Sequence, residues 1–294
     1  MLKTIDHAHL LVTPGQAVHL TDYDPGFKAG FDDKDDARKK MGADIERLAE
    51  LQNVFAADRR NALLVVFQGM DAAGKDGAIR HVMSGVRPQG VDVHSFKQPS
   101  VLELSHDYLW RCVTVLPERG RIGIFNRSYY EELTVVRVHR ATLALEGLPP
   151  EPAGADVWHD RYEDIAAFER HLTRNGTIVV KFFLHISKDE QRERLLERIA
   201  TPDKNWKLSS ADLHERTYWD DYAHAYERLL THTSIPEAPW YVIPADRKWF
   251  ARAAVADVLV ERLSALGLAY PAVDREERAR LDAERVTLEA SGTA

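Results

Sequence analysis

The sequence has little cysteine and no long hydrophobic run. A single cysteine, Cys112, stands among its 294 residues, which excludes an internal disulfide and a metal site built from several cysteines. This cysteine usage favours a reduced, cytoplasmic location. No stretch of about 18 apolar residues is present, which excludes a transmembrane helix, and residues 1–11 lack the apolar core of a secretory signal. We therefore expect an ordinary globular protein without a membrane partner.

Charge is unevenly distributed along the chain. In total, 39 Lys and Arg face 46 Asp and Glu, a formal net charge of −7. Residues 74–140 reverse this balance, with 10 basic and 7 acidic side chains. A positive segment in an acidic protein favours a polyanionic ligand small enough to enter a cleft. It argues against duplex nucleic acid, which needs a broad basic face.

Hydrophobic patterning predicts a single α/β domain. Five apolar runs have the character of strands buried in a parallel sheet, at residues 62–67, 91–96, 121–125, 177–186 and 240–243. Segments with helical spacing alternate with these runs, at residues 33–58, 78–84, 108–116, 157–172 and 251–266. This alternation implies right-handed crossovers and a five-stranded parallel sheet flanked by helices, a three-layer fold.

The remaining segments complete the expected organisation. Residues 1–32 contain turn sequences and are expected to form an N-terminal arm over the surface. The main domain spans residues 33–273 and carries a charged helical insert, the lid, at about residues 188–216. A long aromatic helix is expected to start at Ser209. Residues 274–294 are rich in Glu, Arg and Ala, which predicts a solvent-facing helical tail.

The most informative motif lies between the first predicted strand and the following helix. It reads G-x-x-x-x-G-K and, in this context, predicts a phosphate-binding loop. Backbone N–H groups of such a loop form an anion nest, and the next helix adds its positive end. Lys75 supplies a charge to the outer phosphates. The other residues expected to bind phosphate are Gly69, Met70, Ala72, Ala73, Gly74, Asp76 and Gly77.

One position departs from the usual loop motif. Asp76 replaces the Ser or Thr that normally ligates Mg²⁺ after the lysine. Asp71, inside the loop, is expected to provide the metal contact instead, since carboxylates are ordinary Mg²⁺ ligands. A turn aspartate that only stabilises the loop is the alternative for Asp71. The expected cofactor is Mg²⁺, with Mn²⁺ as the second choice.

Polar residues also follow the third predicted strand and the fourth. Ligands of nucleotide-binding α/β sheets lie at the carboxyl ends of strands, so Arg127 and Arg137 are expected to face phosphates. A surface ion pair is the alternative for Arg127. In the lid, four basic residues are expected to close over the phosphates, with ion pairs inside the lid as the alternative for each: Arg194, Arg198, Lys204 and Lys207.

Together these motifs resemble the polyphosphate kinases of family 2. The resemblance covers about residues 30–270 and rests on residues 69–90, 125–132, 136–139, 202–207 and 219–222. It implies a thymidylate-kinase-like P-loop fold that uses Mg²⁺ to move phosphoryl groups between inorganic polyphosphate and nucleotides. It also implies a homodimer or homotetramer. The sequence Asn-Arg-Ser-Tyr-Tyr-Glu-Glu is similar to the subgroup, class III, that accepts both AMP and ADP.

The expected reaction converts AMP or ADP and polyphosphate into ADP or ATP. The acceptor phosphate is already ionised near pH 7, so catalysis needs positioning and charge stabilisation rather than a general base. Asp71, Lys75, Arg127 and Arg137 are the expected catalytic residues. Candidates for the nucleotide side are Asn126, Tyr130, Glu131 and Glu132. For the two glutamates, a solvated first turn of a helix is an equal alternative.

Two other functions fit a phosphate-binding loop. An ATP-dependent nucleoside monophosphate kinase would normally carry Ser or Thr at the position of Asp76. A nucleotide-binding switch or assembly module would need a water-positioning residue, and the sequence does not identify one. Incubation with AMP and polyphosphate in the absence of ATP separates the first alternative from the expected reaction.

Overall fold

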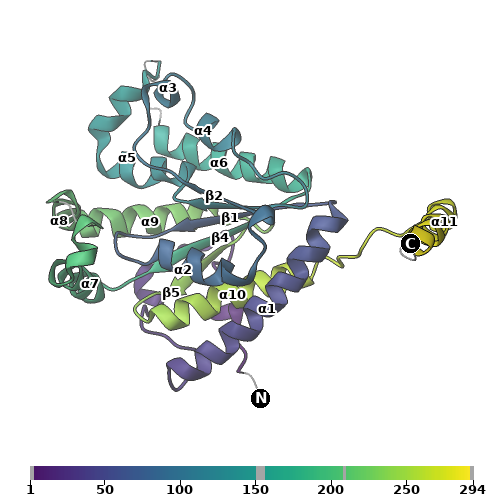
Figure 1. The fold of residues 1–294 in the computed structure, drawn as a ribbon. Helices are drawn as coiled ribbons and strands as arrows, with labels where there is room; N and C mark the ends of the chain where they lie inside the picture. The colour runs from purple at the N-terminus through teal and green to yellow at the C-terminus, as the bar shows by residue number, and fades with distance from the viewer. Residues whose placement is uncertain (1–2, 150–155, 208–209, 292–294) are drawn as a thin grey trace.

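The computed structural model describes residues 3–149, 156–207 and 210–291. Its centre is a five-stranded sheet with helices on both faces (Figure 1). The strands follow the order β2-β3-β1-β4-β5, and each neighbouring pair is parallel. Their bounds are β1 (Ala62–Gln68), β2 (Val91–Ser95), β3 (Ile122–Asn126), β4 (Thr177–His185) and β5 (Trp240–Pro244). The three-layer α/β fold predicted from the sequence is confirmed.

The central strand β1 determines where the loop that follows it lies. β3 and β4 pair with it on either side, and all seven of its residues are buried because helices cover both faces of the sheet (Figure 1). The register pairs Phe67 of β1 with Asn126 at the end of β3. The next backbone N–H, that of Arg127, donates to the Phe67 carbonyl at 3.0 Å. The chain segments that follow β1 and β3 are therefore held together at one edge of the sheet.

Two groups of helices cover the sheet (Figure 1). One face carries α1 (Lys34–Asp58), α2 (Lys75–Val82) and α10 (Lys248–Ser264). The other carries α6 (Val157–Arg174) and α9 (Trp219–Thr233). The other helices before the last one are α3 (Val101–Leu104), α4 (Trp110–Val113), α5 (Val135–Val138), α7 (Lys188–Ala200) and α8 (Ser210–Glu215). None of the helices in the described part of the chain combines the length and apolar character needed to span a bilayer.

Short 3-10 helices connect these elements. They are η1 (His7–His9), η2 (Leu20–Asp22), η3 (Met83–Gly85), η4 (Pro88–Gly90), η5 (Tyr129–Leu133), η6 (Arg140–Glu146), η7 (Pro202–Lys207) and η8 (Arg216–Tyr218). Two helix predictions were too long. The helix expected at 108–116 is the single turn α4, and the backbone bonds of Val115 to Cys112 and of Leu116 to Val113 continue it as tighter turns before Pro117. The aromatic helix is interrupted by η8, and its expected start, Ser209, lies outside the described residues.

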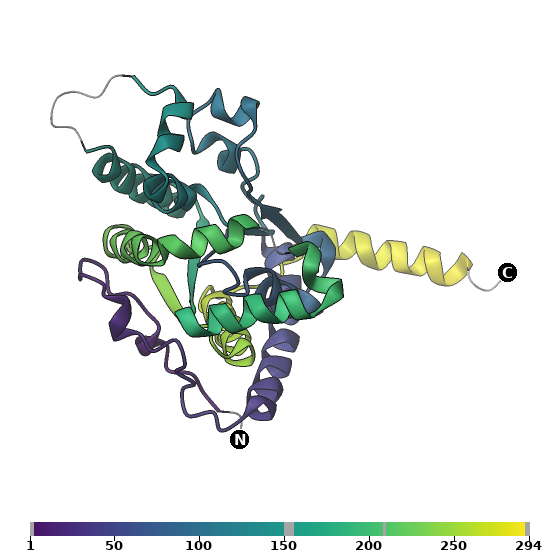
Figure 2. The same cartoon turned by 90° about the vertical axis from the view of Figure 1, so that its left-hand side faces the viewer.

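The two ends of the chain differ in how they contact the domain. Residues 3–31 pass beside β5, where Leu11 forms an antiparallel bridge with Tyr241. Leu10, Val12 and Phe31 are fully buried, so this segment contributes side chains to the core, while most of its residues stay exposed or half-buried at the surface. The last helix, α11 (Arg275–Ser291), has no buried residue and projects away from the domain (Figures 1 and 2).

Candidate active site

The loop between β1 and α2 has backbone angles that favour glycine. Gly69 has a φ of 152° and Gly74, the N-cap of α2, a φ of 107°. A Cβ atom at Gly69 would lie 2.8 Å from the carbonyl oxygen of Leu184 on β4. Ala72, between the two glycines, also has a positive φ, 61°. Such alternation of backbone angles next to a helix N-terminus is typical of an anion nest.

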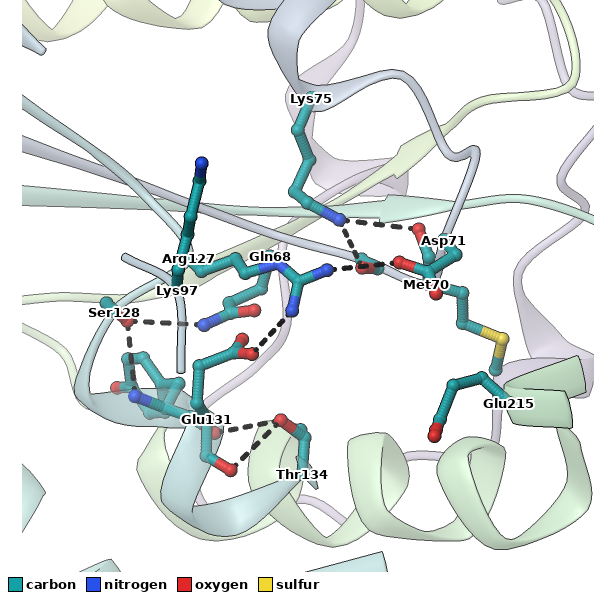
Figure 3. Close-up of polar contacts among 12 residues, drawn as sticks. Gln68, Met70, Asp71, Lys75, Lys97, Arg127, Ser128, Glu131, Thr134 and Glu215 are labelled. Atoms are coloured by element: carbon teal, nitrogen blue, oxygen red, sulfur yellow. Dashed lines mark hydrogen bonds and ion pairs between the residues drawn. The ribbon is translucent and has the colours of Figure 1, made fainter. Parts of the chain in front are cut away.

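The side chain of Lys75 turns back over this loop (Figure 3). Its Nζ donates to the carbonyl oxygen of Gly69 at 2.6 Å and approaches that of Met70 at 3.3 Å. Burial, followed by the nearby Arg127 charge, lowers the pKa of Lys75 to about 8. The charged form of Lys75 is therefore destabilised at this position in the loop as long as no anion is bound beside it.

Arg127 connects the end of β3 to the loop (Figure 3). Its guanidinium contacts the Asp71 carboxylate at 3.1 Å and the Glu131 carboxylate at 3.1 Å. These carboxylates, Glu131 first, hold the pKa of Arg127 above its ordinary value. The residue has a φ of 63°, in the left-handed region, which is uncommon for a side chain of this size. The structure thus brings together three predicted residues, Asp71, Lys75 and Arg127.

Asp71 and Asp76 have different surroundings. Asp71 keeps 30% of its side chain exposed beside Arg127, whereas Asp76 accepts a hydrogen bond from Asn126 at 2.6 Å. Among the described residues, no group of three or more His, Cys, Asp or Glu side chains is arranged to hold a metal. Magnesium in phosphoryl-transfer sites is commonly held by one or two carboxylates together with the substrate phosphates. The Asp71 carboxylate fits an ion of that kind.

The residues after Arg127 divide between the site and the core. Glu131 binds Arg127, and Glu132 accepts a hydrogen bond from Arg161 at 2.7 Å. Burial raises the pKa of Glu132 to about 7. Tyr130 is fully buried, and its hydroxyl donates to Glu169 at 2.7 Å in the core. The prediction that Tyr130 faces a nucleotide is corrected, because its burial leaves no surface for a ligand.

A cavity of about 310 Å³ opens beside Arg127 and Glu131. Its walls come from the segments after β2 and β3. Glu131 and Glu132 of η5 line it. It is also lined by residues that the sequence did not point to, among them Lys97, Tyr108, Arg111 and Glu146. Lys97 follows the end of β2, so the rule that located Arg127 at a strand end could also have found it.

Arg194 is turned away from the expected phosphate position. It is only 5% exposed, and its guanidinium makes five hydrogen bonds. The acceptors are the Glu190 carboxylate and the carbonyl oxygens of Ala72, Ala73, Ala245 and Asp246. All N–H donors of an arginine are thereby used. Arg194 therefore stabilises the loop through the carbonyl oxygens of Ala72 and Ala73. The prediction that it binds phosphate directly is corrected.

The other predicted basic residues lie farther along the chain. Arg137 donates to the Tyr162 hydroxyl at 2.7 Å and lies over the Trp158 ring at 5.4 Å. These contacts place it on α5 against α6, and within the described residues none joins it to Lys75 or Arg127. Arg198 lies in the last turn of α7 and has a half-buried side chain. The side chains of Lys204 and Lys207 lie outside the described part of the structure.

Loss of the Arg194 guanidinium is expected to lower activity through the loop. In the variant Arg194→Gln we expect kcat to fall by about tenfold to a hundredfold, because displacement of a positioning group by about 1 Å has effects of this size. Arg194→Lys should restore little, since a point charge cannot replace the planar fork. Arg192→Gln, an exposed neighbour on the same helix, is the matched control. Wild-type kcat for Arg194→Gln would contradict the positioning role.

The lowered pKa of Lys75 predicts how activity depends on pH. Because the protonated amine is the form that attracts phosphate, kcat/KM should fall as the pH rises through about 8. The variant Lys75→Arg keeps its charge throughout this range, so its lower activity should not decline near pH 8. Steady-state rates at fixed ionic strength between pH 6.5 and 9.5 test this. If the wild type and Lys75→Arg show the same decline near pH 8, the decline belongs to a group other than Lys75.

The sequence matches a family model and several named relatives. The model, Polyphosphate kinase 2 (PPK2), matches residues 31–268. An ADP-polyphosphate phosphotransferase from Rhodopseudomonas palustris is 51% identical, over 92% of this chain and 94% of its own. An AMP/ADP-polyphosphate phosphotransferase from Meiothermus ruber is 45% identical, over 88% of this chain and 94% of its own.

The fold is similar to that of a solved member of the same family. The crystal structure of polyphosphate kinase 2 from Arthrobacter aurescens TC1 is 40% identical in sequence, with a TM-score of 0.82. The match covers 93% of this chain and 95% of the other. Similarity of sequence and similarity of fold therefore extend over nearly the same length.

Proposed function

The chain belongs to the polyphosphate kinase 2 family, and from this membership we propose that it phosphorylates both AMP and ADP at the expense of inorganic polyphosphate. It is a polyphosphate-dependent nucleotide kinase, and kinases of this family use a divalent metal ion. The relative from Meiothermus ruber is named for both nucleotides, which supports the double acceptor range. The observation that supports phosphoryl transfer at this site is the convergence of Asp71, Lys75 and Arg127 on one loop.

The site offers two neighbouring regions for two polyanionic substrates. We assign the phosphates that react to the loop, where Lys75 and Arg127 would neutralise charge on the transferred group. The cavity of about 310 Å³ would take the nucleotide, since its volume suits a small ligand. Lys97 and Arg111 supply positive charge there, and the Tyr108 ring supplies an aromatic surface.

Asp71 would hold the metal ion, which we assign as Mg²⁺ with Mn²⁺ as a substitute. When bound, the ion would neutralise phosphate oxygens and fix their orientation. Arg127 contacts the same carboxylate and would keep it oriented toward the phosphates. The polyphosphate chain beyond the loop would be bound by Arg198, Lys204 and Lys207. Arg137, on α5, is proposed as a further catalytic residue that faces the phosphates.

A nucleotide assay without ATP tests the proposal. Purified protein is incubated with Mg²⁺, polyphosphate and either AMP or ADP, and the products are separated by chromatography. We expect ADP and then ATP from AMP, and ATP from ADP. Phosphorylation of AMP only when ATP is added would assign the chain to the ATP-dependent monophosphate kinases instead. Light scattering in the same buffer tests the proposed homodimer or homotetramer.

A further inference from the structure

A second hollow lies at the opposite end of the sheet from the phosphate-binding loop. Its volume is about 720 Å³. It is lined by residues that precede three strands: Arg59 before β1, Arg87 before β2 and Arg121 before β3. The loop that binds the reacting phosphates follows the carboxyl end of β1. A ligand in this hollow would therefore not compete with substrates at the active site.

Positive charge dominates this hollow. Four arginines line it against the single carboxylate of Glu118. Two of them are committed to the fold: Arg121 binds Asp92 at 2.7 and 2.8 Å, and Arg119 donates to the carbonyl oxygens of Arg60 and Asn175. The other two, Arg59 and Arg87, are exposed, and their side chains make no hydrogen bond or ion pair with any other described residue.

Gln52 and Asn53 also line the hollow, and the amide oxygen of each is buried. Gln52 is only 2% exposed, yet its Oε1 has no hydrogen-bond partner within the described structure, and the Oδ1 of its neighbour Asn53 has none either. Buried polar atoms without a partner are rare in native proteins, and such groups are usually satisfied by water or by a ligand. These two oxygens accept hydrogen bonds, so they call for water or another donor and would not contact phosphate oxygens directly. The part of the hollow that suits an anion is the pair of guanidinium groups of Arg59 and Arg87, which have no partner in the described structure.

We propose that this hollow is a second binding site for condensed phosphate, occupied by a distant segment of the same polyphosphate chain that reacts at the loop. The proposal rests on the proposed function, because that function supplies the polymer. Guanidinium groups match the geometry and charge of phosphate oxygens. Once one end of a flexible polymer is held at the loop, the remainder is present at high effective concentration, so a second weak site strengthens binding of long chains. Short chains cannot reach it.

Removal of the two uncommitted guanidinium groups tests the proposal. The variant Arg59→Asn/Arg87→Ala uses asparagine at the first position because Arg59 has a φ of 52°, which asparagine tolerates. We expect the KM and the Kd for long-chain polyphosphate to rise by about tenfold, while both constants for tripolyphosphate and the kcat stay unchanged. The control, Arg278→Ala/Arg285→Ala on the exposed helix α11, removes the same charge elsewhere.

Three results would overturn the second site. Equal long-chain affinities for the variant and the wild type would mean that the hollow holds only water or simple ions. An equal loss in the α11 control would mean that general surface charge attracts the polymer. A loss of affinity for ATP instead of polyphosphate would assign the hollow to nucleotides. The binding measurement needs no turnover, so it tests the second site independently of the reaction. Wild-type protein that binds polyphosphate but phosphorylates no nucleotide would contradict the proposed function and leave the second site standing.

Discussion

Replacement of Lys75 by alanine is expected to lower kcat by at least about 10²- to 10³-fold. The ammonium lies against the carbonyl oxygens of Gly69 and Met70, within the loop that we assign to the reacting phosphates. No other lysine side chain in the described part of the chain makes a hydrogen bond or ion pair with this loop. The rate of ADP formation from AMP and polyphosphate, measured at saturating substrate, tests the expectation.

The fold should tolerate this change. The folded protein lowers the pKa of Lys75, which means that folding disfavours its charged form. Loss of that charge is therefore not expected to lower the thermal unfolding midpoint. Lys39→Ala, at an exposed position on α1, is the matched control and should keep wild-type kcat. Near-normal turnover of Lys75→Ala in a folded protein would refute the assignment of the loop.

Loss of the Arg127 guanidinium should have a comparable effect, with kcat lower by about 10³-fold. Arginines that neutralise a phosphoryl group in its transition state contribute effects of this size. Without Arg127, the carboxylates of Asp71 and Glu131 would also face the incoming phosphates without a counter-charge. The variant of choice is Arg127→Asn, because asparagine tolerates the left-handed backbone at this position. Single-turnover rates measure the loss directly.

Two further variants separate charge from geometry at this position. Arg127→Lys retains the positive charge but cannot bind two carboxylates in a planar fork, so only a small part of the rate should return. Arg174→Asn, at an exposed position in the last turn of α6, controls for the loss of one surface charge. Equal rates for Arg127→Asn and the wild type would show that Arg127 contributes only to the local ion pairs.

Local sequence patterns were sufficient to predict the sheet and the centre of the candidate site. The five strands are apolar runs, and the loop motif sits between a strand and a helix, so their placement depends on neighbours in the chain. The proximity of Arg127 to Asp71 followed from the rule that ligands gather at the carboxyl ends of parallel strands. The register of β1 and β3 brings these two ends together in the structure.

The direction of particular side chains could not be predicted in this way. Helical spacing places Arg194 and Gln191 on one face of α7, but it does not show what that face contacts. The carbonyl groups that bind Arg194 come from the loop and from the end of β5, far apart in the sequence. Similarly, Tyr130 stands in a polar motif, and its burial depends on Glu169 and Lys181 from two other elements.

The hydrogen bonds of Arg194 also limit how α7 can move. They fasten α7 both to the loop and to the end of β5, through carbonyl oxygens such as those of Ala73 and Ala245. Hydrogen bonds to charged groups contribute about 1.5–3 kcal/mol each, so lifting this helix in every catalytic cycle would be slow. We therefore expect α7 to stay in place through the catalytic cycle and to keep the loop in one conformation while successive phosphates react.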